Sequence, residues 1–309
     1  MAGKRLRPPG PIGPPVIGVG LKISKDTTGF LTRTAKEFQD LSYFKVLNIN
    51  IYYLSKPEYV QHVLQVNNKN YHKGVKYKFL KLFLGQGLLT SEGEFWLQQR
   101  RLAQPAFHKH KIASFAETMT SDTNDMMSDW EIALTDGNKE VDMHHEMMAL
   151  TLRIVGKTLL SKDLKTSTED VESSLGYLIG NIYERVHSIF DIPLWVPTRR
   201  NIGFNKARKV LDGVIYKIID ERFAGADKGE DLLSMLMAAE DEDTGEKMSK
   251  EQLRDEVMTI FVAGHETTAN ALTWTLYLLS THSYVLEKLR QELSEVLQGR
   301  TPTLEDSRS

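Results

Sequence analysis

The sequence of 309 residues contains no cysteine, so the chain can form no disulfide bond and offers no thiolate ligand. It also lacks a strong charge imbalance, since its formal net charge is only −2. This argues against a nucleic-acid binder or a polycation. We find neither an internal repeat nor a low-complexity tract. With 41% hydrophobic residues the chain has enough apolar material for one large core, and the missing cysteines fit a reducing compartment.

A secretion signal is missing as well. Residues 1–7 are basic, but no apolar stretch of signal length separates them from Pro8. We therefore expect a cytoplasmic protein without a membrane anchor.

The most informative segment that is present interrupts the long apolar run from Val257 to Leu279. It reads Ala263-Gly264-His265-Glu266-Thr267-Thr268. A helix that is apolar nearly all round is expected to be buried. A carboxylate or hydroxyl inside it costs several kcal/mol unless it has a partner, and an interior glycine costs about 1 kcal/mol of helix propensity. A glycine, a carboxylate and two hydroxyls each destabilise such a helix, so their occurrence together indicates a chemical function.

The flanks of this run predict where its helix begins and ends. Ser249 and Gln252 have the spacing of a capping box, so the helix should begin at about Lys250, and residues 281–283 are its expected exit. A membrane span is one alternative, but His265 and Glu266 near the centre and the acidic residues 240–243 argue against it. A zinc hydrolase is another, and it fails because Ala269 stands where H-E-x-x-H needs its second histidine.

Two motifs resemble one known family. The A-G-x-E-T-T pattern at 263–268 is similar to the oxygen-binding helix of the cytochrome P450 haem-thiolate monooxygenases. Trp96-x-x-x-Arg100, followed by residues 102–108, resembles a second element of that family. Weaker similarities occur in three further segments, the proline-rich opening at 7–11 and residues 231–236 and 286–297. The resemblance therefore runs from about residue 7 to about residue 305, and it favours the soluble bacterial type.

The resemblance implies a haem cofactor, with Trp96 and Arg100 binding a propionate. Ser91 and Glu94 have capping-box spacing, which predicts a helix that places Trp96 and Arg100 on one face. Indole N–H and guanidinium groups only donate hydrogen bonds, so the pair suits a carboxylate. The alternative is an ordinary stacked Trp–Arg pair.

For the central motif the resemblance implies that Glu266 and Thr267 deliver protons to dioxygen. It also implies that Ala263, Gly264 and Thr268 lie against the haem. We expect Gly264 to allow a local bulge and His265 to face the oxygen side. The alternative is that the threonine hydroxyls bond back to carbonyls one turn earlier.

The family's proximal parts are missing from the sequence. Its iron is held by a cysteine thiolate in a loop that follows an E-x-x-R helix. Glu287-x-x-Arg290 fits those letters, but it directly follows the oxygen helix and is interpreted as chance. We therefore expect a single, incomplete haem-monooxygenase domain over 1–309, truncated at its C-terminus, whose metal ligand lies outside this chain.

Periodicity predicts a mainly α fold with a small β-sheet. We expect a hairpin from strands at 43–47 and 51–54 and a helix from Lys56 to about Val66. Further helices are predicted at 111–134, 143–161, 168–190 and 203–224.

The resemblance also implies a substrate pocket. Its predicted lining is Phe79, Phe83, Leu84, Leu88 and Phe261, beside Ala263. An apolar pocket suits a lipophilic, fatty acid-like substrate, although each of these residues could instead belong to the core. Electrons would come from a ferredoxin, a flavodoxin or a reductase, which could dock on a basic patch of Arg100, Arg101, Lys109 and Lys111.

The sequence thus predicts a haem-dependent monooxygenase that uses dioxygen, present here as an inactive fragment. The alternative is a helical binding module without catalysis, or a nonfunctional truncated product.

Overall fold

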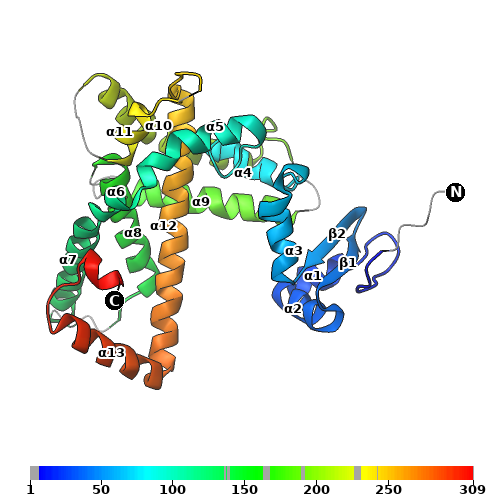
Figure 1. Ribbon diagram of the computed structural model, residues 1–309, viewed down its shortest axis with the longest axis horizontal. Helices are drawn as coiled ribbons and strands as arrows, with labels where there is room; N and C mark the ends of the chain where they lie inside the picture. The colour runs from blue at the N-terminus through cyan, green and yellow to red at the C-terminus, as the bar shows by residue number, and fades with distance from the viewer. Residues whose placement is uncertain are drawn as a thin grey trace. The chain divides into compact units, whose positions relative to one another are not determined.

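The computed structural model describes residues 7–135, 137, 140–162, 168–188, 192–225, 231–241 and 243–308. This part of the chain is mainly helical and contains one small sheet, which confirms the predicted fold class (Figure 1). The chain divides into two compact units, residues 1–73 and 74–309. The single domain expected over 1–309 stays a prediction.

The first unit is built around a two-stranded antiparallel sheet of β1 (Leu41–Val46) and β2 (Ile49–Leu54), which pairs Leu41 with Leu54 and Val46 with Ile49. This confirms the predicted hairpin. Phe30 and Phe44 lie in its small core with Val19, edge to face with ring centres 5.4 Å apart. The elements of the unit are α1 (Gly20–Lys25), α2 (Thr27–Phe38), β1 (Leu41–Val46), β2 (Ile49–Leu54), α3 (Pro57–Gln61), a π-helix (His62–Val66) and a 3-10 helix (Asn68–Asn70).

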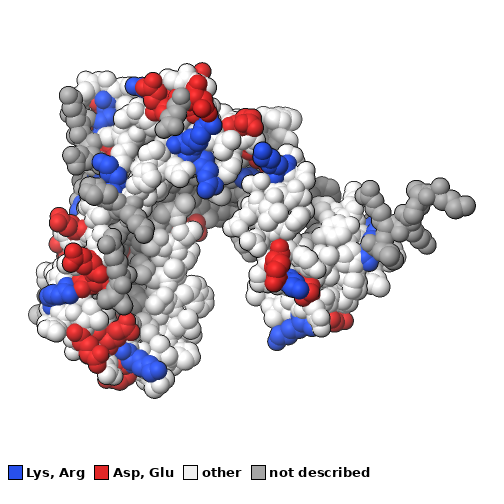
Figure 2. Space-filling view, in the orientation of Figure 1, with Lys and Arg blue, Asp and Glu red and all other residues white. Residues whose placement is uncertain are grey.

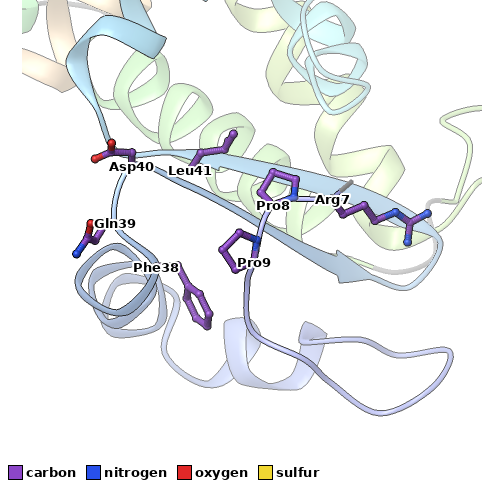
Figure 3. A pocket seen from close by; sticks show the side chains of 7 residues that line it. All are labelled: Arg7, Pro8, Pro9, Phe38, Gln39, Asp40 and Leu41. Atoms are coloured by element: carbon purple, nitrogen blue, oxygen red, sulfur yellow. The ribbon is translucent and has the colours of Figure 1, made fainter. Parts of the chain in front are cut away.

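The proline-rich opening runs along the free edge of β1. The amide of Tyr43 donates to the carbonyl of Pro9 at 3.0 Å, and the amide of Val19 donates to the carbonyl of Lys45 at 2.8 Å. An edge strand paired in this way offers fewer free groups to other chains. Figure 3 shows the open pocket of about 450 Å³ that Pro8 and Pro9 line opposite Phe38.

The second unit contains the remaining helices. They are α4 (Tyr77–Leu84), α5 (Gly93–Ala103), a 3-10 turn (Gln104–Phe107), α6 (Lys109–Ala113), α7 (Ala116–Thr135), α8 (Met143–Leu160), α9 (Thr168–His187), α10 (Arg199–Phe223), α11 (Leu232–Ala238), α12 (Lys250–Thr281), α13 (Ser283–Leu297) and a 3-10 helix (Leu304–Arg308). The predicted helices at 143–161, 168–190 and 203–224 match α8, α9 and α10. The predicted helix at 111–134 is divided between α6 and α7.

Helix α12 begins at Lys250, as its capping box predicts. The Gln252 amide donates to the Ser249 hydroxyl at 3.2 Å, and the Ser249 amide donates to the Gln252 side chain at 2.6 Å. The expectation that the whole helix is buried is wrong. Its first half lies in the core, whereas Trp274 in the second half is 63% exposed.

Ala269 is the last buried residue of α12, and it packs in a cluster with Met147 and Leu150 of α8, which begins at Met143. No Lys, Arg, Asp or Glu occurs from residue 267 to residue 286, and Figure 2 shows uncharged surface along this part of α12. Among the described residues, no helix combines the length and the hydropathy that crossing a bilayer requires.

A buried ion pair ties α10 to the start of α11. Arg222 donates to both carboxylate oxygens of Asp231, at 3.0 and 2.7 Å, and Asp231 also caps α11 by accepting from the Ser234 amide at 2.9 Å. Burial would raise the pKa of Asp231, but the bonds from Arg222 and Ser234 outweigh it and hold the pKa below the usual 3.8.

We expect Asp231→Ala to lower the free energy of unfolding by about 3–5 kcal/mol, because it removes the buried carboxylate that accepts two bonds from the buried Arg222 guanidinium. The matched control is Asp220→Ala, which removes the exposed pair with Lys250 and should cost about 1 kcal/mol or less. Urea titrations measure both. The wild-type advantage over Asp231→Ala should shrink as pH falls through the lowered pKa of Asp231, and equal losses in the two variants would contradict the assignment.

Candidate functional site

The 263–268 segment is positioned by the packing of α12 against α8. Phe261 and Leu160 line one small void, Gly264 lies beside Val155, and Ala269 packs in a cluster with Met147 and Leu150. Partners on α8 therefore have falling numbers as those on α12 rise, so the two helices run antiparallel (Figure 1).

Gly264 makes the close approach of these helices possible. A Cβ atom at this position would lie 3.2 Å from a methyl group of Val155, tighter than an ordinary contact. Helix α12 is an unbroken α-helix through Gly264, so the expected bulge is wrong. The glycine serves interhelical packing, where a small residue lets two backbones come close.

His265 is fully buried on the α8 side. Its Nε2 lies 3.1 Å from the carbonyl oxygen of Met148, so Nε2 carries a hydrogen and donates, while no described group pairs with Nδ1. Burial lowers the pKa of His265, with a smaller contribution from the charge of His144, and the ring is neutral at pH 7. The side chain of His265 therefore lies about 200° around the helix from that of Ala263, and the expectation that it faces the oxygen side stays a prediction.

The opposite face of the same turn is open. Ala263, Thr267 and Thr268 are exposed, and Glu266 is half-buried. The Thr267 hydroxyl donates to the carbonyl of Ala263 one turn earlier, which is the local alternative foreseen from the sequence. Burial raises the pKa of Glu266, and the charge of His144 opposes that rise.

The Trp96–Arg100 pair lies on α5. The predicted capping box is wrong, since α5 begins at Gly93 and the Ser91 hydroxyl instead donates to the Gly87 carbonyl at 3.0 Å. The guanidinium of Arg100 lies 5.2 Å from the centre of the Trp96 ring, so the two share a face as predicted. Within the described part of the chain, neither the indole N–H nor this guanidinium has a hydrogen-bond partner, and nothing recorded joins the pair to residues 263–268.

The remaining predicted residues have different surroundings. Four of the five pocket residues are at most 3% exposed and belong to the main core, and Leu88 packs on that core while partly exposed. The four are Phe79, Phe83, Leu84 and Phe261.

In the basic patch, Arg101 forms ion pairs with Asp241 at 3.0 Å and Asp243 at 2.8 Å, so its charge is neutralised. The Lys109 side chain lies outside the described residues.

Sequence reasoning missed a second polar group on α12. Asp255, Glu256 and Thr259 contact the turn between α4 and α5, and Glu256 is fully buried. Two acidic residues directly before an apolar run were the available signal, but close to a helix N-terminus such residues are usually solvated. Among the described residues, no three His, Asp or Glu side chains gather as a metal site would require.

Comparison with known proteins gives one consistent result. The profile of the family "Cytochrome P450" matches residues 8–309. Cyclooctatin synthase of Streptomyces melanosporofaciens is 35% identical over 96% of this chain and 64% of its own length. Cyclooctat-9-en-7-ol 5-monooxygenase of the same organism is 35% identical over 82% of this chain and 54% of its own length. Leukotriene-B4 omega-hydroxylase 3 of Mus musculus is 31% identical over 73% of this chain and 46% of its own length. The chain thus spans at most 64% of the length of these relatives.

We expect Glu266→Gln to stabilise the protein at pH 8 and to leave its stability unchanged at pH 4. The raised pKa of Glu266 means that its ionised form is disfavoured in the fold, so wild-type stability falls as pH rises from the ordinary 4.5 through the raised value. Urea midpoints at the two pH values measure this. Glu287→Gln on α13, where the side chain is exposed, is the control and should show no such difference. A stabilisation by Glu266→Gln that is equal at both pH values would show that charge burial is not its cause.

Proposed function

The chain belongs to the cytochrome P450 family, and from that premise we propose that it forms the oxygen-binding side of a haem-dependent monooxygenase. The proposed reaction is hydroxylation of a lipophilic, fatty acid-like substrate in the reducing environment of the cytoplasm. It would consume dioxygen and electrons from a ferredoxin, flavodoxin or reductase. Members of this family use haem, and two of the relatives above are named as a monooxygenase and a hydroxylase.

The single observation that carries this proposal is the two-faced turn at 263–267. One face is closed against α8 by Gly264 and His265, and the other exposes Ala263 and Thr267 beside an acid of raised pKa. A methyl group and a hydroxyl leave room for a flat cofactor. The exposed face therefore offers a hydroxyl, with a carboxyl group of raised pKa beside it, to a bound ligand.

The Trp96–Arg100 pair fits a haem propionate. Both groups are donors without described hydrogen-bond partners, and Arg100 is exposed beside the ring. A charge-assisted bond from a guanidinium to a carboxylate is stronger than a neutral one, and Trp96 restricts the orientation of the guanidinium. The thiolate ligand cannot come from these 309 residues, since they include no cysteine.

When bound, the haem would supply the electron-transfer chemistry that activates dioxygen. In this arrangement the Thr267 hydrogen is committed to the Ala263 carbonyl, so its oxygen offers only lone pairs. It can therefore accept a hydrogen bond as it stands, and it must rotate to donate one. Glu266, whose burial favours the protonated form, would hold the proton that is passed on.

The proposed substrate class rests on apolar surroundings and on relatives. Phe79, Phe83 and Leu84 belong to the same apolar core as Phe261, and Leu88 is the partly exposed member of the predicted pocket. Two relatives are named for the oxygenation of cyclooctat-9-en-7-ol and of leukotriene B4. Docking of an electron donor would rest on Lys111, because Arg101 is held by Asp241 and Asp243 and Arg100 is assigned to the propionate.

A binding module without catalysis is the second candidate, and the absence of cysteine favours it for the 309 residues taken alone. We expect the reduced chain mixed with haemin and carbon monoxide to show no thiolate-type Soret band. Such a band from this sequence would contradict the assignment of the missing ligand.

We expect Arg100→Gln to weaken haemin binding by about tenfold, because it removes the cation that pairs with a propionate. Haemin titration followed by the Soret absorbance measures the dissociation constant. Arg290→Gln on α13 removes an exposed charge elsewhere and serves as the matched control. Unchanged binding by Arg100→Gln would remove the support for a propionate site at Trp96 and Arg100.

A further inference from the structure

The segment from Gly85 to Ser91, which joins α4 to α5, is a compact turn. The amides of Thr90 and Ser91 both donate to the Gly87 carbonyl at 2.9 Å. The Thr90 hydroxyl donates to the Gly85 carbonyl at 2.6 Å. Thr90 and Ser91 are fully buried, and Gly85 has a φ of +66°, which few residues other than glycine adopt. The turn is therefore well defined by its own bonds.

The turn is also bound to one face of α12. The amide of Gln86 donates to Asp255 at 2.7 Å, and the amide of Leu88 donates to Glu256 at 3.1 Å. Between them, Gly87 approaches so closely that a Cβ would lie 2.2 Å from the Thr259 hydroxyl and 2.6 Å from the Asp255 carbonyl. Three successive residues of the turn thus meet three polar residues that share one face of the helix.

Holding the turn with Glu256 costs more free energy than holding it with a neutral side chain would. It is fully buried, its Oε1 has no described hydrogen-bond partner, and the Thr259 hydroxyl is unpaired as well. A glutamine or a serine could accept from the Leu88 amide without burying an ionisable group. Leaving a buried polar atom unpaired costs about 1–3 kcal/mol, so a structural bond alone does not explain the choice of an acid.

The charges around Glu256 are otherwise balanced. On α12, Arg254 pairs with Asp255 at 2.9 Å and with Asp212 of α10. The cations on the other neighbouring helices are also engaged or solvated. Arg208 of α10 donates to the Leu82 carbonyl, and Lys81 of α4 is exposed. Arg153 and Lys157 of α8 bind Asp122, and Asp231 of α11 binds Arg222. The turn itself presents backbone amides. None of these groups supplies a cation that would hold Glu256 ionised.

We propose that Asp255, Glu256 and Thr259 form a clamp that fixes the turn Gly85–Ser91 on α12, with Glu256 as the positioning residue for Leu88. Leu88 is the pocket residue that remains partly exposed, and its backbone is held directly by the Glu256 carboxyl group. The role of Leu88 toward substrate rests on the proposed function. The clamp itself does not, since its bonds lie entirely within the described chain.

The clamp has a protonation dependence of defined sign. Burial raises the pKa of Glu256 to about 7; the bond from the Leu88 amide lowers it and the charge of Asp255 raises it. When the turn opens, the carboxyl group is solvated and its pKa returns toward 4.5. The closed turn therefore binds the proton more tightly than the open one, so it is most stable at low pH and loosens as pH rises from 4.5 to about 7.

Hydrogen exchange of the Leu88 amide tests the clamp. In the wild-type chain the protection factor, which is corrected for intrinsic exchange, should fall about tenfold between pH 6 and pH 8. Glu256→Gln keeps the acceptor but cannot ionise, so its protection factor should be the same at both pH values. Glu256→Ala loses the acceptor and should lower protection at pH 6 by about tenfold. Amides of α8 provide the internal reference for global stability.

Two glycine substitutions test the clamp without changing any ionisable group. Gly87→Ala must push the turn off Thr259 and should abolish protection at either pH, whereas Gly74→Ala, with open space around it, should change nothing. A pH-independent Leu88 protection factor in the wild type, or the same pH dependence in Glu256→Gln, would overturn the proposal. So would Gly87→Ala that leaves Leu88 as protected as in the wild type.

Binding of a fluorescent dodecanoic acid separates the clamp from the proposed function. Weaker binding by Glu256→Ala than by Glu256→Gln, at equal global stability, supports the positioning of Leu88. Equal binding by the two variants overturns that positioning role. If the wild-type chain does not bind the probe, the proposed substrate class is contradicted, while the exchange measurement still decides whether the clamp exists.

Discussion

The close antiparallel packing of α8 against α12 is the constraint on which the rest of the second unit depends. Gly264 lets the backbones approach at Val155, and His265 fills the interface by bonding to the Met148 carbonyl. Because side chains two residues apart on a helix point in nearly opposite directions, sealing this face leaves Ala263 and Thr267 on the open one. The geometry needed for a ligand site therefore follows from the packing that closes the core.

The same helix serves three purposes along its length. A capping box fixes its first turn, so the register of every later residue on α12 is set. One turn further, Asp255 and Glu256 hold the segment that carries Leu88, and two turns beyond them the polar motif packs on α8. A single helix thus fixes the position of the turn that carries Leu88 relative to Glu266 and Thr267. A displacement of α12 would therefore move both together.

Local patterns in the sequence predicted much of this arrangement. Ser249 and Gln252 located the start of α12, and periodicity located α8, α9 and α10, because caps and apolar spacing are encoded within a few residues. The errors involve long-range partners. The bulge at Gly264 and the free charge of Arg101 depend on Val155 and Asp241, which lie far away in the chain. The burial of Glu256 was missed for the same reason, since the turn that covers it is separated from it by 168 residues.

Glu256 and Glu266 show why burial alone does not define a proton carrier. Burial raises the pKa of both carboxyl groups. Glu256 is sealed beneath the Gly85–Ser91 turn, so a proton can reach it from solvent only when that turn opens. Glu266 is half-buried beside the exposed Thr267 and feels the charge of His144, so it can exchange protons while the fold stays closed. Repeated proton delivery requires a residue that exchanges protons while the fold stays closed, as Glu266 can. A residue whose protonation depends on whether a segment is closed must instead be sealed beneath that segment, as Glu256 is.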